Sequence, residues 1–125
     1  MAAIAKPVYL RSHRLQGRVL QFILGAEDDD LRERARLSKS GRAAKTLVKE
    51  GSLRITLVAM TAGSALQSHQ VAGPVSIQSM RGCLRLQTDA GDIKVPSGHL
   101  VALDAGVTHT TTAVEDSLVL LTLAK

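Results

Sequence analysis

The strongest constraint on the fold is a series of short segments after Gly51 in which apolar and polar residues alternate. Segments 52–60, 74–80 and 82–88 each follow this pattern, and Gly, Pro and Asp residues separate one segment from the next. A period of two is the side-chain spacing on one face of a β-strand, and Gly and Pro mark the turns between strands. In the first segment one face carries Leu53, Ile55, Leu57 and Ala59, and the other carries Arg54, Thr56, Val58 and Met60. The pattern predicts an all-β antiparallel sandwich or barrel over residues 51–125.

Two later segments, 99–103 and 117–123, are apolar on both faces. A strand of this kind is expected to be covered on both sides, here by the N-terminal residues or by a second subunit. We therefore expect a homodimer.

Residues 1–50 have a different pattern, and we interpret them as an N-terminal extension packed on the barrel within a single domain. They predict a strand over Arg14–Leu24, a charged helix over residues 26–41 that ends at Gly41, and a strand over residues 42–50. The acids of the helix lie at its start and the bases towards its end, as the helix dipole favours. Its few apolar residues predict that it covers a sheet edge without forming a core.

The composition favours a globular chain, with 45% apolar and 22% charged residues. The net charge is +5, and most of the excess lies before Gly51. Only one Tyr, one Phe and no Trp occur, which argues against the aromatic stacking platforms of single-strand nucleic-acid binders. We therefore interpret residues 11–49 as a mixed-charge surface, with contact to nucleic acid as an alternative.

The single cysteine, Cys83, excludes an intramolecular disulfide and a Cys-rich zinc site. No segment approaches the roughly 18 apolar residues of a membrane span, and the first ten residues lack the apolar run of a signal peptide. These features predict a cytoplasmic protein with no membrane contact. We expect the thiol to be buried and unreactive.

Two groups of glycines and histidines have a recognisable spacing. His69 follows Gly63 after five intervening residues, and Gly82 closes the first group. Gly98, Gly106 and His109 form the second. This arrangement resembles the two motifs of the cupin superfamily, G-x5-H-x-H-x3,4-E-x6-G and G-x5-P-x-G-x2-H-x3-N. The resemblance covers about the last three fifths of the chain and implies a small RmlC-like β-barrel of two facing sheets.

In metal-binding cupins, three histidines and a glutamate hold a divalent ion on the inner face of the barrel. His69 and His109 stand at two of these positions, but Val71 and Val75 replace the second histidine and the glutamate. The resemblance therefore implies an incomplete divalent-metal site at His69 and His109. A further ligand would have to come from the remaining candidates, Gln70, Gln78, His99 or Asp104.

The leading hypothesis is a small-molecule-binding cupin whose ligand lies in a mostly apolar pocket. The predicted pocket residues are His69, Val71, Val75, Ile77, His109 and Thr111. One alternative is an enzyme, either a metal-dependent oxygenase or isomerase with variant ligands or a metal-free acid–base catalyst that uses the histidines. A second alternative is a basic regulatory protein that contacts nucleic acid. A third is that the two histidines have no role in binding and only form hydrogen bonds in the core.

Overall fold

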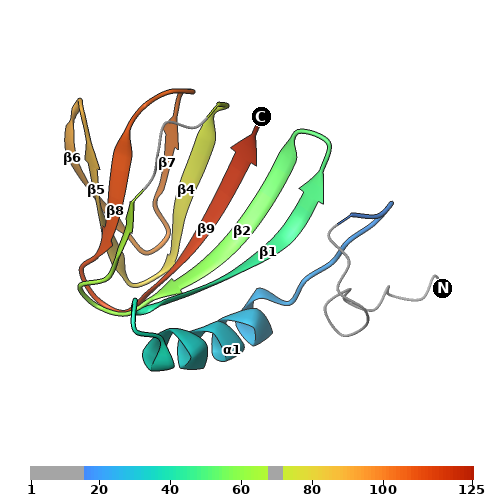
Figure 1. Cartoon of the computed structure of the whole chain (residues 1–125), viewed down its shortest axis with the longest axis horizontal. Helices are drawn as coiled ribbons and strands as arrows, with labels where there is room; N and C mark the ends of the chain where they lie inside the picture. Colours follow the sequence, from blue (N-terminus) through green and yellow to red (C-terminus); the bar gives the residue numbers. More distant parts are fainter. Residues whose placement is uncertain (1–15, 68–71) are drawn as a thin grey trace.

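Nine strands and one helix make up the part of the chain that the computed structural model describes, residues 16–67 and 72–125 (Figure 1). In chain order they are α1 (Leu24–Leu37), β1 (Arg42–Glu50), β2 (Leu53–Met60), β3 (Ala65–Gln67), β4 (Val75–Arg81), β5 (Cys83–Thr88), β6 (Gly91–Pro96), β7 (Leu100–Leu103), β8 (His109–Ala113) and β9 (Ser117–Ala124). Within the described ranges, no helix is long and apolar enough to cross a membrane.

The strands form two antiparallel sheets that face each other. The five-stranded sheet has the order β1-β2-β9-β4-β7, and the four-stranded sheet has the order β3-β8-β5-β6. All the pairs within both sheets are antiparallel. This confirms the all-β architecture of two facing sheets that the alternating segments predict.

A first core fills the space between the sheets. The alternation in β2 is confirmed: Val58 and Met60 point into this core, whereas Leu57 and Ala59 point to the opposite face. The buried members of the first core are Val58, Met60, Ile77, Leu84, Leu86, Val95, Ala113 and Val119.

A second core lies between α1 and the outer face of the five-stranded sheet. Leu31 and Ala35 of the helix are 0% and 2% exposed, and they pack in one cluster with Leu57 and Leu118. The expectation that the helix forms no core is therefore wrong. Two well-placed apolar residues suffice, because β1, β2 and β9 supply the other buried residues of this core.

An ion pair at the margin of the second core also joins the helix to β1. Lys45 Nζ donates to Glu27 Oε1 at 2.9 Å and to Oε2 at 3.1 Å. The Glu27 side chain is only 4% exposed, so a buried carboxylate ties the first turn of α1 to the sheet.

The strand predicted over Arg14–Leu24 is wrong in its described part. Residues 16–23 form no strand, and α1 already begins at Leu24. Leu20, Phe22 and Leu24 instead pack against the second core. The apolar residues recur at every second position because the segment packs on an apolar cluster, although no strand pairs with it.

The segment 42–50, assigned to the extension, is the edge strand β1 and pairs with β2 along its length. The division of the chain at residue 50 stays a prediction.

The strand β9 is covered on both faces, since Leu118 lies in the second core and Val119 in the first. On β7, by contrast, Leu100 is 55% exposed.

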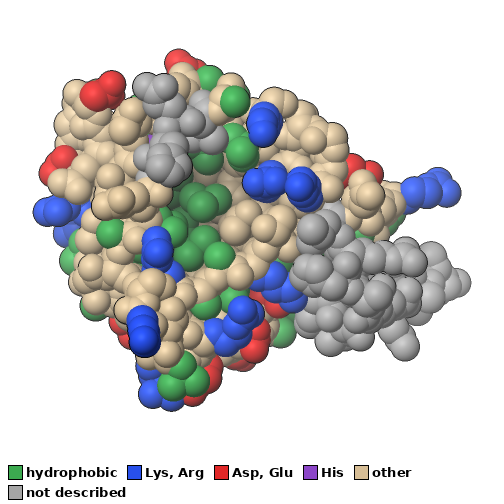
Figure 2. All heavy atoms as spheres, viewed as in Figure 1, with side chains coloured by type: hydrophobic (Ala, Val, Ile, Leu, Met, Phe, Trp, Pro, Cys, Tyr) green, Lys and Arg blue, Asp and Glu red, His purple; other side chains and the backbone are tan. Residues whose placement is uncertain are grey.

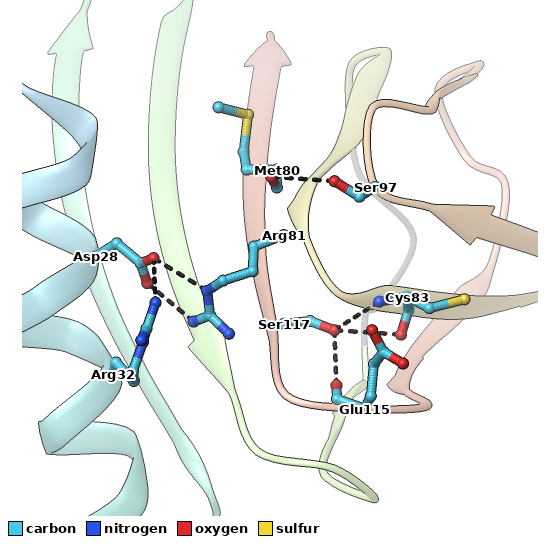
Figure 3. A network of polar contacts seen from close by, with 8 residues as sticks. All are labelled: Asp28, Arg32, Met80, Arg81, Cys83, Ser97, Glu115 and Ser117. Carbon is cyan, nitrogen blue, oxygen red and sulfur yellow. Dashed lines mark hydrogen bonds and ion pairs between the residues drawn. The ribbon is translucent and has the colours of Figure 1, made fainter.

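Gly82 forms the sharp corner between β4 and β5, with φ +84°. A Cβ atom there would lie 2.3 Å from the carbonyl oxygen of Asp116 and 2.4 Å from Ser117 Oγ. Ser117 Oγ accepts a hydrogen bond from the Cys83 amide at 3.1 Å and lies 2.7 Å from the Glu115 carbonyl oxygen (Figure 3). Ser117 thus joins this corner to the turn between β8 and β9, and the Cys83 thiol is buried there as expected.

We predict that Gly82→Ala destabilises the protein far more than Gly63→Ala. Gly63 has nearly the same φ, +86°, but no atom lies within 4 Å of its added Cβ. Both variants bear the cost of a left-handed residue, roughly 1–2 kcal/mol, and only Gly82→Ala adds a clash with backbone. Urea unfolding of both variants measures the difference, and equal losses of stability would contradict the clash.

Candidate ligand-binding site

Cross-strand pairing arranges the inner face of the five-stranded sheet in rows that run across its strands. The face is identified by Val58, Ile77 and Val119, which lie in the first core. Residues two positions apart on a strand share a face. One row is Thr46, Thr56, Leu121, Ile77 and Val101, and the row beside it is Lys49, Arg54, Leu123, Val75 and Leu103.

The second of these rows lies at the open end of the space between the sheets. The β1–β2 turn, the end of β9, the start of β4 and the connection from β7 to β8 all lie at this edge in Figure 1. Val119 and Ile77, nearer the other end, are fully buried, whereas Leu66, Leu103 and Leu121 are partly exposed. In Figure 2, the face turned toward the viewer has a hollow near its middle, with hydrophobic side chains at its floor.

The four-stranded sheet contributes two buried polar side chains, His109 and Thr111 of β8. They are 6% and 2% exposed, and alternation places them on the same face as Ala113 of the first core. His109 Nδ1 lies 3.1 Å from the carbonyl oxygen of Val107. Because a carbonyl oxygen only accepts, Nδ1 carries the proton in the neutral ring.

The structure places four of the six predicted pocket residues on the two facing inner surfaces. Val75 and Ile77 of β4 are 8% and 0% exposed, opposite the sheet that carries His109 and Thr111. His69 and Val71 lie outside the described residues. A role of these residues in binding stays a prediction.

The described residues do not fit the metal site of the metal-binding cupins. Val75, at the glutamate position, pairs with Leu123 and Leu103, and His99 and Asp104 are exposed. Gln78 faces the opposite side of β4 from Ile77. Over residues 16–67 and 72–125, His, Cys, Asp and Glu side chains form no group of three that could hold a metal ion. We therefore derive no chemistry through a metal.

Two residues of this surface, Lys49 and Arg54, were not among the predicted site residues. The alternation in β2 separates Arg54 from Leu53, but it does not say which face is inside. The register of β2 with β9, which pairs Arg54 with Leu123, places Arg54 on the inner face. No signal in the sequence alone fixes that register.

A separate polar region fixes α1 to β4 on the outer face of the same sheet. Arg81 Nε and Nη2 donate to the two carboxylate oxygens of Asp28 at 3.0 and 2.9 Å, and Arg32 Nη2 donates to Oδ2 at 3.1 Å (Figure 3). Cavities of about 130 and 460 Å³ lie on either side of Arg81. Since both Arg81 and Arg32 are already paired with Asp28, we interpret this region as a clamp for the helix.

Burial of Asp28 opposes its ionisation, but the hydrogen bonds and charges of Arg81 and Arg32 outweigh burial and hold the pKa of Asp28 below its ordinary value of 3.8. The ionised carboxylate therefore stabilises the folded state. Other bases of the helix are paired as well, Arg34 with Asp30 and Arg36 with Glu33. These pairs agree with the mixed-charge surface expected for this part of the chain.

No family model matches the chain, and no curated protein matches it. Solved structures do match. A protein of unknown function from Streptococcus pyogenes is 25% identical, with a TM-score of 0.65 over 70% of this chain and 77% of that one. A cupin superfamily protein from Desulfitobacterium hafniense is 13% identical, with a TM-score of 0.64 over 66% of this chain and 76% of that one. An RmlC-like cupin from Shewanella frigidimarina is 13% identical, with a TM-score of 0.64 over 68% of this chain and 77% of that one.

We predict that Asp28→Asn lowers the free energy of unfolding at neutral pH by roughly 2 kcal/mol, because charge-assisted hydrogen bonds are lost. Since the pKa of Asp28 is lowered in the folded protein, its contribution is complete above the unfolded value of 3.8 and is lost as the pH falls through the folded value. Urea unfolding over a pH series measures both effects. Asp29→Asn, an exposed change on the same helix, is the control. A difference between wild type and Asp28→Asn that does not shrink in acid would contradict the clamp.

Proposed function

This chain has the cupin fold, and we propose that it binds a small, largely apolar molecule between its two sheets, near His69 and His109. The observation that carries the proposal is the composition of the inner face. On β9, β4 and β7 both rows are apolar, and they face a second sheet on which His109 and Thr111 are buried polar groups. A concave apolar surface with a few fixed polar groups is the usual form of a small-molecule site.

The two polar groups would orient the ligand. Thr111 pairs with Leu66 on one side and Leu86 on the other, so its side chain is surrounded by apolar neighbours. The contact of His109 Nδ1 with the Val107 carbonyl restricts the rotation of the imidazole ring. His69 would add a second imidazole, by its place in the first motif. A ligand with one or two hydrogen-bonding groups and an apolar body matches this arrangement.

We propose binding rather than catalysis for a specific reason. The inner-facing positions of the described strands carry no carboxylate, and Val75 occupies the motif position of the glutamate. Acid–base or metal-dependent chemistry would need groups that these strands do not supply.

Thermal unfolding in the presence of a library of small apolar molecules tests the proposal. A ligand at 100 times its Kd is expected to stabilise the folded state by about 2.7 kcal/mol, which raises the Tm by roughly 10 °C. We expect His109→Ala to weaken binding about tenfold, since one orienting hydrogen bond is lost.

His99→Ala is the matched control, because His99 is exposed and is expected to leave binding unchanged. Equal weakening by both variants would contradict a role for His109. If no compound in the library raised the Tm, the proposed function itself would be wrong.

We also propose that the chain forms a homodimer through the outer face of β7. Leu100, 55% exposed, and Ala102 lie on that face beyond the part of the sheet that α1 covers. Light scattering is expected to give twice the chain mass of 13.3 kDa, and Leu100→Lys is expected to shift it to the monomer. Val114→Lys, at a site that is 56% exposed in the β8–β9 turn, is the control. A dimer that Leu100→Lys leaves intact would place the interface elsewhere.

A further inference from the structure

We propose that the ligand of this site is a small organic anion, a carboxylate with an apolar body, whose charged group is bound by Lys49 and Arg54. This inference rests on the proposed function and adds the chemical class of the ligand. It comes from the row at the open end of the site, which begins with two cations and continues with apolar side chains.

The two cations lie side by side at one end of that row. Lys49 of β1 pairs with Arg54 of β2, and both side chains are exposed. Arg54 pairs on its other side with Leu123, and the row continues through Val75 to Leu103. A single row across the strands therefore leads from two positive charges onto an apolar surface.

Two hydroxyl groups stand beside the cations. Thr46 and Thr56 pair with each other one row further in and are partly buried. Arginine, lysine and threonine together offer charge and several hydrogen-bond donors, which suit a carboxylate. The corner at β1 and β2 is thus polar, while the rest of the row is apolar.

The cations are not already neutralised within the described part of the chain, where neither Lys49 nor Arg54 has an ion-pair partner. The described ion pairs use Arg32, Arg34, Arg36, Lys45 and Arg81 instead. The neighbouring acid, Glu50, pairs with Leu53 and so belongs to the opposite face. Two like charges directly opposite each other on adjacent strands are unfavourable, and a bound anion would relieve that repulsion.

A like-charged pair alone does not make a site, and the chain itself provides the comparison. Arg85 of β5 pairs with Lys94 of β6, and both are exposed on the outer face of the four-stranded sheet. That pair has the same two residue types and the same cross-strand geometry, but it faces away from the core that holds Leu84 and Leu86. Of these two pairs, the one that combines the charges with a row of apolar side chains is Lys49 and Arg54.

The row also limits the size of the ligand. Arg54 and Leu103 are separated by three strand spacings, from β2 through β9 and β4 to β7. At about 4.8 Å for each spacing this is roughly 14 Å. A medium-chain fatty acid such as octanoate fits this length with its carboxylate at Arg54.

The test compares octanoate with octan-1-ol, which has the same chain without the charge, in NMR titrations of the full chain at low salt. We expect octanoate to bind about tenfold more tightly than octan-1-ol. The double variant Lys49→Gln/Arg54→Gln is expected to abolish this preference, so that octanoate binds it no more tightly than octan-1-ol does. The matched double variant Arg85→Gln/Lys94→Gln, with the same loss of charge, is expected to keep the preference.

The outcomes separate this inference from the proposed function. If octan-1-ol binds as tightly as octanoate, the ligand is not an anion and the inference is wrong, although the site still binds small apolar molecules. A preference that survives in Lys49→Gln/Arg54→Gln would overturn the assignment to these two residues. If neither compound binds, the proposed function fails and the inference fails with it.

Discussion

The two central strands of the five-stranded sheet, β2 and β9, must be covered on both faces, and the remaining elements are arranged around that requirement. Val58 and Val119 pack in the core between the sheets, while Leu57 and Leu118 pack beneath α1. Burying one such side chain contributes about 1.5–3 kcal/mol. The four-stranded sheet on one side and the helix on the other are therefore both necessary. The Glu27–Lys45 and Asp28–Arg81 ion pairs fix the helix in the place where it covers this surface.

The same strands that form the two cores also form the candidate site. β2 and β9 continue from their fully buried residues to the open end, where Arg54 is exposed and Leu123 is only partly buried. A site built on such strands inherits a rigid backbone, which holds side chains in place better than a loop does. The buried hydroxyl of Ser79, which has no hydrogen-bond partner in the described structure, lies on β4 two residues beyond Ile77. Polar groups therefore occur on this inner face both deep in the core and near the open end. Those near the open end are placed to contact a ligand.

Much of the fold could be predicted from the period of two, because strand side chains alternate whatever their partners are. The alternation in β2 and β5 is confirmed residue by residue, with Leu84 and Leu86 in the first core. The same rule failed at Leu20, Phe22 and Leu24, where an extended segment packs on a cluster without a partner strand. The faces of β2 could not be assigned either, since each of them carries apolar residues and the choice depends on the register with β9. Val75 and His109 could be named from motif spacing, and Ile77 and Thr111 from their alternation with those residues, whereas Arg54 could not be assigned to the inner face.

Val75 stands where the cupin motif has a glutamate, and this affects where the proposed site could recognise polar groups of a ligand. In the metal-binding cupins that the motifs resemble, the ion is held on the inner face of the barrel. In this chain Val75 makes the centre of the outermost row apolar, and the polar groups are found on β8, at His109, and on β1 and β2, at Lys49 and Arg54. A ligand bound here would interact with these polar groups at its two ends, and its apolar middle would contact the barrel. Specificity would then depend on the distance between its polar groups as much as on their chemistry, because the strand spacing fixes where the partners on the protein stand.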